Sequence, residues 1–464
     1  MKQVDVAIIG AGSGGLSAWH EIKKVTPNVV MINDGLHGTT CARVGCMPSK
    51  VLIQVANDFH RREVFLSEGI HGGDDLTVSR VEALAFVRKL RDRFVASVMS
   101  TIEEIGERNI AGRAEFLEPN LLRVGDQEIA AQKIVLATGS RPIIPDRWRA
   151  LGARLLTSDS VFEQDDLPDR IAVMGVGIIG LELGQALARL GCSVTAFGRS
   201  GRIGGLTDPA VNAVAVKTLG SELDLQFSRD VQIDQPGGDA LRVTWDGQAL
   251  EVDVILCALG RRPNVDGIGL DRLGVESDAD GVPLFNRQTM QVGDLPIFIA
   301  GDVLNELPLL HEASDEGRIA GYNCVHDEMR SFRRRTPLKV TFCDPNIGTV
   351  GAHYTQLDPA RTEVGEVSFE GQGRSIVMSK EKGLLRVYGE RETGRLLGAE
   401  MIAPSGEHLS HLLSWAIQRG LTAVEALQLP FYHPVIEEGL RTALRDLRNR
   451  CGPDHSGLEI PFDE

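Results

Sequence analysis

The sequence predicts an α/β fold with two Rossmann-like dinucleotide-binding domains and a C-terminal α+β domain. Two glycine-rich segments, residues 10–15 and 175–180, support this prediction, because each follows an apolar strand and opens a helix. Each half then ends in a further strand and a turn, at residues 136–142 and 254–263. The two halves therefore look like internal repeats, and the remaining chain forms a separate unit.

The length and charge of the chain limit its organisation and its partners. A chain of 464 residues needs roughly two to four domains, and the net charge of −15 argues against a wide nucleic-acid surface. Arg333, Arg334 and Arg335 form a short basic run, which we expect to be a solvated linker. No stretch has the pattern of a signal peptide or a membrane span, so we expect a soluble, cytoplasmic protein without a membrane partner.

The first domain is expected to begin with a strand at residues 4–9, then the first glycine-rich turn, a helix at 16–24 and a strand at 29–32. The glycines that let the backbone approach a pyrophosphate at the helix N-terminus are Gly10, Gly12 and Gly15. An acidic residue usually ends the second strand and binds the ribose, but Asn33 stands there, with Asp34 beside it. Either side chain can hydrogen-bond a ribose hydroxyl.

A cysteine pair follows this second strand. Four residues separate Cys41 from Cys46, and Pro48 with the apolar periodicity up to residue 59 predicts a helix that begins beside them. A helix N-terminus favours a thiolate, so the pair can close a small redox-active disulfide. A structural disulfide or half a metal site is the alternative, but no second cysteine pair or histidine cluster supports a metal. We expect inert buried thiols at Cys192, Cys257, Cys324, Cys343 and Cys451.

The chain between the two glycine-rich segments is expected to serve packing. Apolar residues recur every three or four positions over residues 78–105, which predicts a long helix. Short strands are expected over residues 110–129, and a strand at 134–136 runs into a sharp turn at Gly139. That turn ends the sheet of the first half.

The second domain repeats this order, with a strand at 171–174, a helix at 181–190 and a strand at 193–197. Its fingerprint glycines are Gly175, Gly177 and Gly180. No acidic residue ends the second strand, and Arg199 and Arg202 follow it instead. Because arginine pairs well with a 2′-phosphate, this favours NADPH; surface arginines and an NAD site with weaker ribose contacts are the alternative.

The last third of the chain adds a turn acid, Asp302, after a strand at 297–299, and then a helix over 309–326. In the C-terminal unit we expect strands at 340–342, 384–387 and 396–401, and helices at 406–419 and 435–447. Its clearest polar group is His433 with Glu438. A histidine titrates near neutrality and suits a base for a thiol, while a carboxylate can fix its tautomer.

This order of motifs is similar to that of the pyridine nucleotide-disulfide oxidoreductases, flavoproteins that include dihydrolipoamide dehydrogenase, glutathione reductase and mercuric reductase. The matching segments are GTTCARVGCMPSK at 38–50, ATGSRP at 137–142, IFIAGD at 297–302 and YHPVIEE at 432–438. The resemblance spans nearly the whole chain, and dihydrolipoamide dehydrogenase is nearest in appearance. Tyr432 stands where those dehydrogenases usually have a small residue.

The resemblance implies FAD in the first domain, NAD(P) in the second and a homodimer formed through the C-terminal domain. The implied FAD-binding residues are Gly10, Gly12, Gly15, Asn33, Asp34, Lys50, Gly139, Asp302, Leu310 and His311. The implied NAD(P)-binding residues are Gly175, Gly177, Gly180, Glu182, Arg199, Arg202 and Gly260, with Glu182 also paired to Lys50. The implied domains are 1–149 (FAD), 150–264 (NAD(P)), 265–335 (completing the FAD domain) and 336–450 (dimerisation), with a loose polar tail at 451–464.

The resemblance also implies catalytic roles. Cys41 is the thiol that meets the substrate and Cys46 is the thiol that faces the flavin, while His433, oriented by Glu438, reaches the disulfide of the partner subunit. We therefore expect a dihydrolipoamide dehydrogenase-like enzyme that passes electrons between a dithiol or disulfide and NAD(P) through the cysteine pair and FAD. A lipoyl group on a carrier protein is one such substrate.

The sequence leaves two other functions open. Arg199 and Arg202 motivate an NADPH-dependent reductase of another small disulfide, similar to glutathione reductase. Tyr432 and the missing ribose acids motivate a non-catalytic flavoprotein that serves as a redox sensor or as a complex subunit. Mercuric reductases and large thioredoxin reductases match less well, because they carry a second cysteine pair near the C-terminus, where only Cys451 stands.

Overall fold

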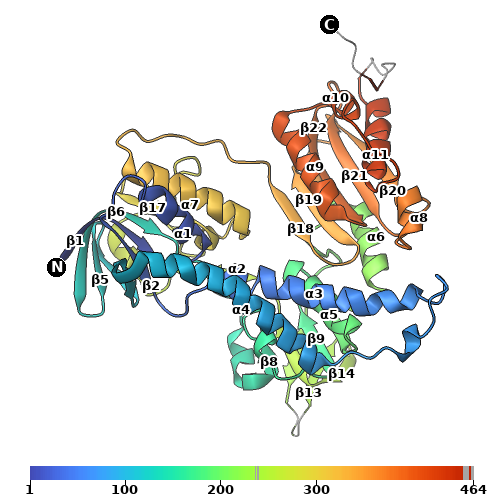
Figure 1. The fold of residues 1–464 in the computed structure, drawn as a ribbon, viewed down its shortest axis with the longest axis horizontal. Coiled ribbons are helices and arrows are strands. Elements are labelled where there is room, and N and C mark those ends of the chain that lie inside the picture. The colour runs from blue at the N-terminus through green and yellow to red at the C-terminus, as the bar shows by residue number, and fades with distance from the viewer. Residues whose placement is uncertain (236, 238–239, 453–458, 461–464) are drawn as a thin grey trace.

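The computed structural model describes residues 1–235, 237, 240–452 and 459–460. It consists of two units built on mainly parallel sheets and a third unit with an antiparallel sheet (Figure 1). The predicted fold class is thereby confirmed. None of the helices in the described residues is long and apolar enough to cross a membrane. Most of the predicted tail lies outside the described residues.

The first unit is a seven-stranded sheet with a parallel centre. β1 (Lys2–Ile9) pairs with β2 (Val29–Asn33) and β6 (Gln127–Leu136), and its last four residues are buried, as in a strand covered on both faces. β17 (Ile297–Ile299) also pairs with β6, although the whole second unit separates them in the chain. The outer strands are β3 (Asn109–Ala111), β4 (Ala114–Glu118) and β5 (Leu121–Val124). α1 (Ser13–Ile22) and α7 (Leu310–Val325) pack on each other beside this sheet.

The second unit repeats this plan with a five-stranded parallel sheet in the order β11-β10-β9-β15-β8. These strands are β8 (Leu155–Leu156), β9 (Arg170–Met174), β10 (Ser193–Gly198), β11 (Asp224–Phe227) and β15 (Val254–Cys257). Its helices are α5 (Ile178–Arg189) and α6 (Pro209–Leu219). An antiparallel sheet packs onto it and consists of β12 (Val231–Asp234), β13 (Leu241–Trp245) and β14 (Gln248–Val252). The chain crosses between the units through β7 (Ser140–Pro142) paired with β16 (Arg261–Pro263).

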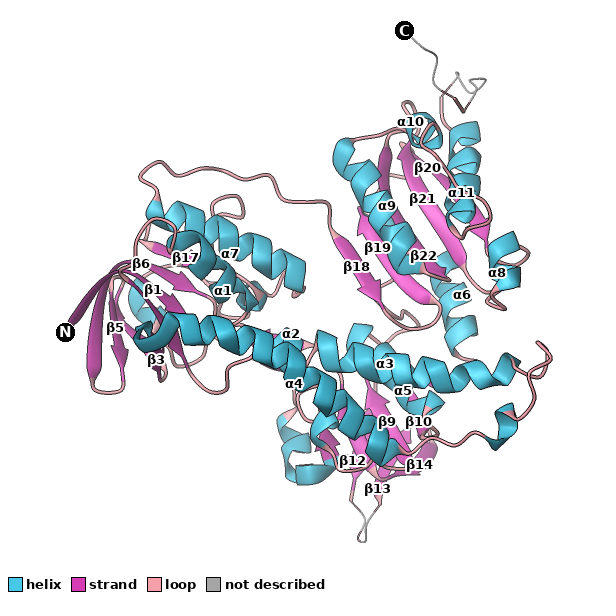
Figure 2. Cartoon of the chain, viewed as in Figure 1, coloured by secondary structure: helices cyan, strands magenta, loops and turns pink. Residues whose placement is uncertain are grey.

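Three helices follow the second strand and span both units (Figure 2). They are α2 (Thr40–Arg43), α3 (Cys46–His60) and α4 (Arg80–Ile105). The buried face of α3 packs on α5, so the helix that follows the cysteines lies against the second unit. Cys41 lies on α2 rather than in the loop that the sequence suggests. Thr39 caps this helix by accepting a hydrogen bond from the backbone N–H of Ala42 at 3.2 Å, and four residues are too few for an apolar periodicity.

The third unit is an antiparallel sheet with helices on its faces. The strands, in the order β18-β19-β22-β21-β20, are β18 (Leu338–Thr341), β19 (Asn346–Gly351), β22 (Leu396–Ala403), β21 (Leu384–Glu390) and β20 (Thr362–Ser368). The helices are α8 (Gly373–Val377), α9 (Gly406–Arg419), α10 (Ala423–Leu427) and α11 (Glu437–Arg450). α9 packs on β19 and β22, and α11 packs on β20 and β21.

The linker from α7 to β18 corrects one expectation from the sequence. The arginine run does not form a solvated linker as a whole, because Arg334 is hydrogen-bonded to two buried glutamates of α7 and Arg335 is paired with Asp315. Arg333 and Arg335 are both exposed as expected, but only Arg333 has no ion pair among the described residues. The acids that hold the linker lie 18 to 22 residues back along the chain, where no local pattern reveals them.

Candidate active site

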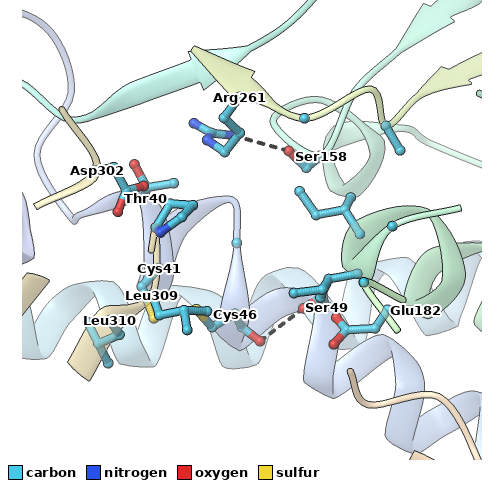
Figure 3. Close-up of a pocket in the computed structure, with 18 of the residues that line it drawn as sticks. Thr40, Cys41, Cys46, Ser49, Ser158, Glu182, Arg261, Asp302, Leu309 and Leu310 are labelled. Carbon is cyan, nitrogen blue, oxygen red and sulfur yellow. Dashed lines mark hydrogen bonds between the residues drawn. The ribbon is translucent and has the colours of Figure 1, made fainter. Parts of the chain in front are cut away.

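A cleft of about 930 Å³ lies where the three units meet. Figure 3 shows the part of it that contains the cysteines. The predicted site residues that line it are Gly12, Cys41, Cys46, Lys50, Gly139, Gly175, Gly177, Glu182, Arg199, Arg202, Gly260, Asp302, Leu310 and His311. The predicted residues outside its lining are Gly10, Gly15, Asn33, Asp34, Gly180, His433 and Glu438.

The two glycine-rich loops are built alike. Gly10 and Gly175 have φ values of +107° and +114°, and a Cβ at either would collide with a backbone carbonyl of the neighbouring segment. In contrast, nothing lies within 4 Å of a Cβ placed at Gly12 or Gly177, and both of these glycines line the cleft. Each loop therefore presents a helix N-terminus with free space in front of it, which fits one dinucleotide pyrophosphate per loop.

Asn33, which stands at the end of β2 in place of the usual acid, already makes hydrogen bonds within the protein. The Asn33 Oδ1 atom accepts a hydrogen bond from the backbone N–H of Ala11 at 3.1 Å, and its Nδ2 atom donates to the Gly35 carbonyl at 3.1 Å. Asn33 thus fixes the first glycine-rich loop. Asp34 is exposed and, within the described part of the chain, forms an ion pair only with the Arg113 guanidinium at 3.9 Å, so it is the freer of the two candidates for a ribose hydroxyl.

The matching position at the end of β10 has no room for an acid. A Cβ at Gly198 would lie 2.6 Å from a methyl group of Val176 and 3.1 Å from the ring of Phe227. Arg199 and Arg202, which come next, are exposed and line the cleft. The sequence indicated the missing acid and the arginines, but the apolar side chains that fill the position of the acid became visible only in the fold.

The two cysteines differ in their surroundings. Cys41 is half-buried on α2, Cys46 is exposed at the start of α3, and both sulfurs are unbonded. A hydrogen bond from the Cys41 thiol lowers the pKa of Cys46 to about 7, with burial opposing and the Lys50 ammonium assisting this shift. The same hydrogen bond, together with burial, raises the pKa of Cys41. When the pair ionises, the negative charge therefore lies on Cys46 and not on Cys41. The remaining five cysteines are buried, which confirms the expected burial of these thiols.

Lys50 connects the cysteine helix to the second unit. Its Nζ atom lies 2.8 Å from a Glu182 carboxylate oxygen, which is the pairing that the family resemblance implies. The other oxygen of Glu182 accepts a hydrogen bond from the backbone N–H of Phe342 at 2.8 Å, and Nζ lies 4.6 Å from the centre of the Phe342 ring. Glu182 is buried, so this pair holds a cation beside the cysteines and joins α3, α5 and the end of β18.

Removing this cation should make the thiolate harder to form. We expect Lys50→Met to raise the pKa of Cys46 by about one unit, because an opposite charge nearby favours the ionised thiol. The pH dependence of Cys46 alkylation in the reduced protein, followed by peptide mass analysis, measures this shift. Lys89→Met removes an exposed lysine of α4 as the control. An unchanged alkylation profile in Lys50→Met would show that Lys50 does not act on the thiol.

The turn after β17 is held by residues that the sequence alone did not single out. The Ser140 hydroxyl donates to the Asp302 carboxylate at 3.1 Å, and the Arg261 guanidinium donates to the Ser140 hydroxyl at 2.9 Å. Arg261 also binds Asp159 at 3.0 Å. Figure 3 shows Asp302 and Arg261 on the same side of the cleft. The ATGSRP segment contains Ser140, but its partners Asp302 and Arg261 lie 162 and 121 residues away in the chain, so no local pattern links them.

His433 and Glu438 form a pair, but they lie outside the cleft of their own chain. The Nδ1 atom of His433 lies 3.0 Å and 3.1 Å from the two oxygens of Glu438, and Glu438 also accepts from the backbone N–H of Val435 at 3.3 Å. Hydrogen bonding to His433 lowers the pKa of Glu438. The His433 side chain is 80% exposed, in the third unit just before α11. A single chain therefore does not bring this pair to the cysteines.

Comparison with known proteins agrees with this geometry. Residues 4–317 match the family described as pyridine nucleotide-disulphide oxidoreductase, and residues 338–444 match the dimerisation domain of that family. The chain is 28% identical over 470 residues to dihydrolipoyl dehydrogenase 3 of Haloarcula marismortui, with 96% of this chain and 97% of that protein covered. It is also 28% identical over 450 residues to a mercuric reductase of Staphylococcus aureus, with 95% and 81% covered.

Solved structures share the fold. LpdA from Mycobacterium tuberculosis superposes with a TM-score of 0.81 at 24% identity, with 96% of this chain and 100% of that chain covered. The flavoprotein disulfide reductase RclA from Escherichia coli also gives a TM-score of 0.81, at 21% identity, with 95% and 99% covered.

Proposed function

Because the chain belongs to the pyridine nucleotide-disulphide oxidoreductase family, whose members use FAD and NAD(P), we propose that it is a dihydrolipoamide dehydrogenase-like enzyme. Its substrate would be a dithiol or its disulfide. The main supporting observation is the unequal thiol pair, Cys41 and Cys46, in a cleft that also receives both glycine-rich loops. We keep the domain boundaries at 149/150, 264/265, 335/336 and 450/451 as part of the proposal.

The residues of the cleft fit the two cofactors. We propose that FAD is held by the loop at Gly12, by Asp302 and by the start of α7, and that NAD(P) is held by the loop at Gly177. When bound, FAD supplies a carrier that takes an electron pair from thiols and gives a hydride to a nicotinamide. The protein itself must then supply an accessible sulfur, a stabilised thiolate and a proton acceptor.

The thiol chemistry follows from the difference between the two sulfurs. In the oxidised enzyme a substrate thiolate attacks Cys41, which breaks the Cys41–Cys46 bond and forms a mixed disulfide with the substrate. Cys46 leaves as a thiolate that the Lys50 ammonium stabilises, and once Cys41 is a thiol again its hydrogen bond lowers the pKa of Cys46 to about 7. The second substrate thiol loses its proton to His433 of the partner subunit and attacks the substrate sulfur, which releases Cys41. The substrate is oxidised to a disulfide, and the cysteine pair is reduced by the same two electrons.

A substrate panel tests this proposal. We expect reduction of NAD(P) by dihydrolipoamide and, in reverse, NAD(P)H-dependent reduction of lipoamide that is faster than that of glutathione disulfide. Faster turnover of glutathione disulfide would instead favour the small-disulfide reductase. No turnover of either disulfide with either nucleotide would favour the non-catalytic redox sensor or complex subunit.

The nucleotide of the second domain is a separate question, and we propose NADP(H). The filled space at Gly198 leaves no place for the acid that binds the 2′-hydroxyl of NAD, and Arg199 and Arg202 offer cations for a 2′-phosphate. This observation also favours the second candidate function, an NADPH-dependent reductase of another small disulfide.

Reversing the charge at Arg199 should therefore weaken NADPH binding selectively. We expect Arg199→Glu to raise the dissociation constant for NADPH about 10- to 100-fold and to change that for NADH less than about threefold, because one charge-assisted hydrogen bond to phosphate is lost. Titration with both nucleotides measures this, and Arg229→Glu, an exposed arginine of the same unit outside the cleft, is the control. Equal effects on the two nucleotides would remove Arg199 from the 2′-phosphate site.

A further inference from the structure

We propose that Arg334, in the linker between α7 and β18, is a positioning residue of the flavin site that acts through Glu316 on the turn at Gly301. This inference rests on the proposed function only in placing FAD in the cleft, and it holds for any disulfide substrate. Arg334 is the most buried member of the arginine run. The proposed catalytic reaction does not use it.

Hydrogen bonds to other segments hold the linker along its length. Asn323 on α7 accepts a hydrogen bond from the backbone N–H of Arg330 at 2.9 Å, and the backbone N–H of Phe332 donates to the Gln288 carbonyl at 2.9 Å. At its far end the hydroxyl and backbone N–H of Thr336 donate to the Gln418 side chain of α9. The segment therefore has a fixed course from α7 to β18, which Figure 2 shows as a long loop between the first and third units.

Arg334 stands at the centre of this course. Its Nη2 atom lies 2.5 Å from a Glu312 oxygen and 2.8 Å from a Glu316 oxygen. The two glutamate side chains are only 5% and 4% exposed. One guanidinium thus serves two buried carboxylates on the same face of α7. A carboxylate buried without such a partner is strongly unfavourable, and burial raises the pKa of Glu316 to about 7 even with Arg334 present.

Glu316 links Arg334 to the lining of the cleft. Its second oxygen accepts a hydrogen bond from the backbone N–H of Gly301 at 2.8 Å. Gly301 has φ +87° and ψ −160°, a region that side chains rarely adopt, so the turn needs support from outside its own backbone. Gly301 and Asp302 both line the cleft, and Asp302 is held on its other side by Ser140.

The contacts therefore form one chain from the linker to the cleft. Arg334 holds Glu316 in place, Glu316 holds the Gly301 N–H, and that bond orients Asp302. If Arg334 is lost, the Glu316 carboxylate is buried without a partner, and its displacement toward water frees the turn. The same linker leads directly into β18, so the third unit and the flavin end of the cleft share this anchor.

The dissociation constant for FAD, measured from flavin fluorescence on dilution of the holoenzyme, tests this inference without reference to turnover. We expect Arg334→Met to weaken FAD binding about tenfold, and the matched control Arg333→Met, next to it and exposed, to change it less than about twofold. Arg334→Lys should weaken FAD binding less than about threefold, which is half of the tenfold loss on a logarithmic scale, because an ammonium can still pair with the carboxylates. Equal FAD binding in Arg334→Met and Arg333→Met would overturn the inference.

A double-mutant cycle tests whether Arg334 acts through Glu316. In a Glu316→Gln background, which keeps an acceptor for the Gly301 N–H without a charge, Arg334→Met should cost less than about threefold in FAD affinity. A tenfold loss in both backgrounds would overturn the inference. Should Arg334→Met alone fail to fold, a variant that combines it with Glu312→Gln and Glu316→Gln leaves neither carboxylate buried without its partner, and this variant carries the test. It is expected to fold and to bind FAD within about threefold of Glu312→Gln/Glu316→Gln, and weaker binding than this, or failure to fold, would also overturn the inference. Loss of dithiol turnover with unchanged FAD binding would count against the proposed function and not against the role of Arg334.

Discussion

Replacing Cys46 with serine should lower dithiol-dependent reduction of NAD(P) at least about a thousandfold, with FAD still bound. The proposed reaction moves electrons as a pair through a sulfur–sulfur bond, which serine cannot form. It also needs a leaving group that is stable as an anion. We assign this role to Cys46, which the Lys50 ammonium stabilises and whose pKa in the reduced pair is lowered to about 7 by the Cys41 hydrogen bond. Initial rates with dihydrolipoamide and each nucleotide measure the effect.

Controls separate this chemistry from folding. Cys192→Ser changes a buried thiol outside the cleft and should keep the wild-type rate. Cys41→Ser should be as inactive as Cys46→Ser, but its remaining Cys46 thiol should still react with an alkylating agent. Turnover of Cys46→Ser within about tenfold of the wild type would contradict a relay through the cysteine pair.

The fold could be predicted largely because its signals are local. A buried strand, a glycine-rich turn and an amphipathic helix follow one another within about thirty residues in each half, and the same order appears twice. The four-residue helix that carries Cys41 could not be predicted in this way, because a single turn has no periodicity to detect. Its cap, Thr39, has φ +59°, which no propensity rule suggests for a β-branched residue.

The site was predictable where residue type alone carries the chemistry and unpredictable where distant segments meet. The cysteine pair could be read from its spacing, whereas the pairing of Lys50 with Glu182, 132 residues away, came only from resemblance to a family. The expectation that Arg334 is solvated is wrong, because its partners are buried acids on α7. A run of charged residues, taken alone, indicates only exposure to solvent. Tertiary contacts of this kind decide the local electrostatics and leave no periodic trace in the sequence.

Replacing His433 with glutamine should lower the same turnover about a hundred- to ten-thousandfold, as expected for loss of a general base. Glutamine preserves much of the shape of the side chain but cannot accept a proton near neutral pH. Glu438→Gln should have a smaller effect, because it keeps the base and removes only the carboxylate 3.0 Å from Nδ1. His408→Gln, at an exposed histidine of α9 that does not line the cleft, is the control and should keep the wild-type rate.

The exposed position of His433 leads to a sharper test, because in the proposed reaction this histidine serves the cysteines of the other subunit. Cys41→Ser and His433→Gln subunits, each inactive alone, should regain about a quarter of the wild-type activity when unfolded, mixed equally and refolded. About half of the dimers are then mixed, and each mixed dimer holds one site with an intact cysteine pair and an intact histidine. If His433 served its own chain, neither site of a mixed dimer would be complete, and mixing would restore no activity. The dimerisation domain at residues 338–444 supplies the assembly that this exchange requires.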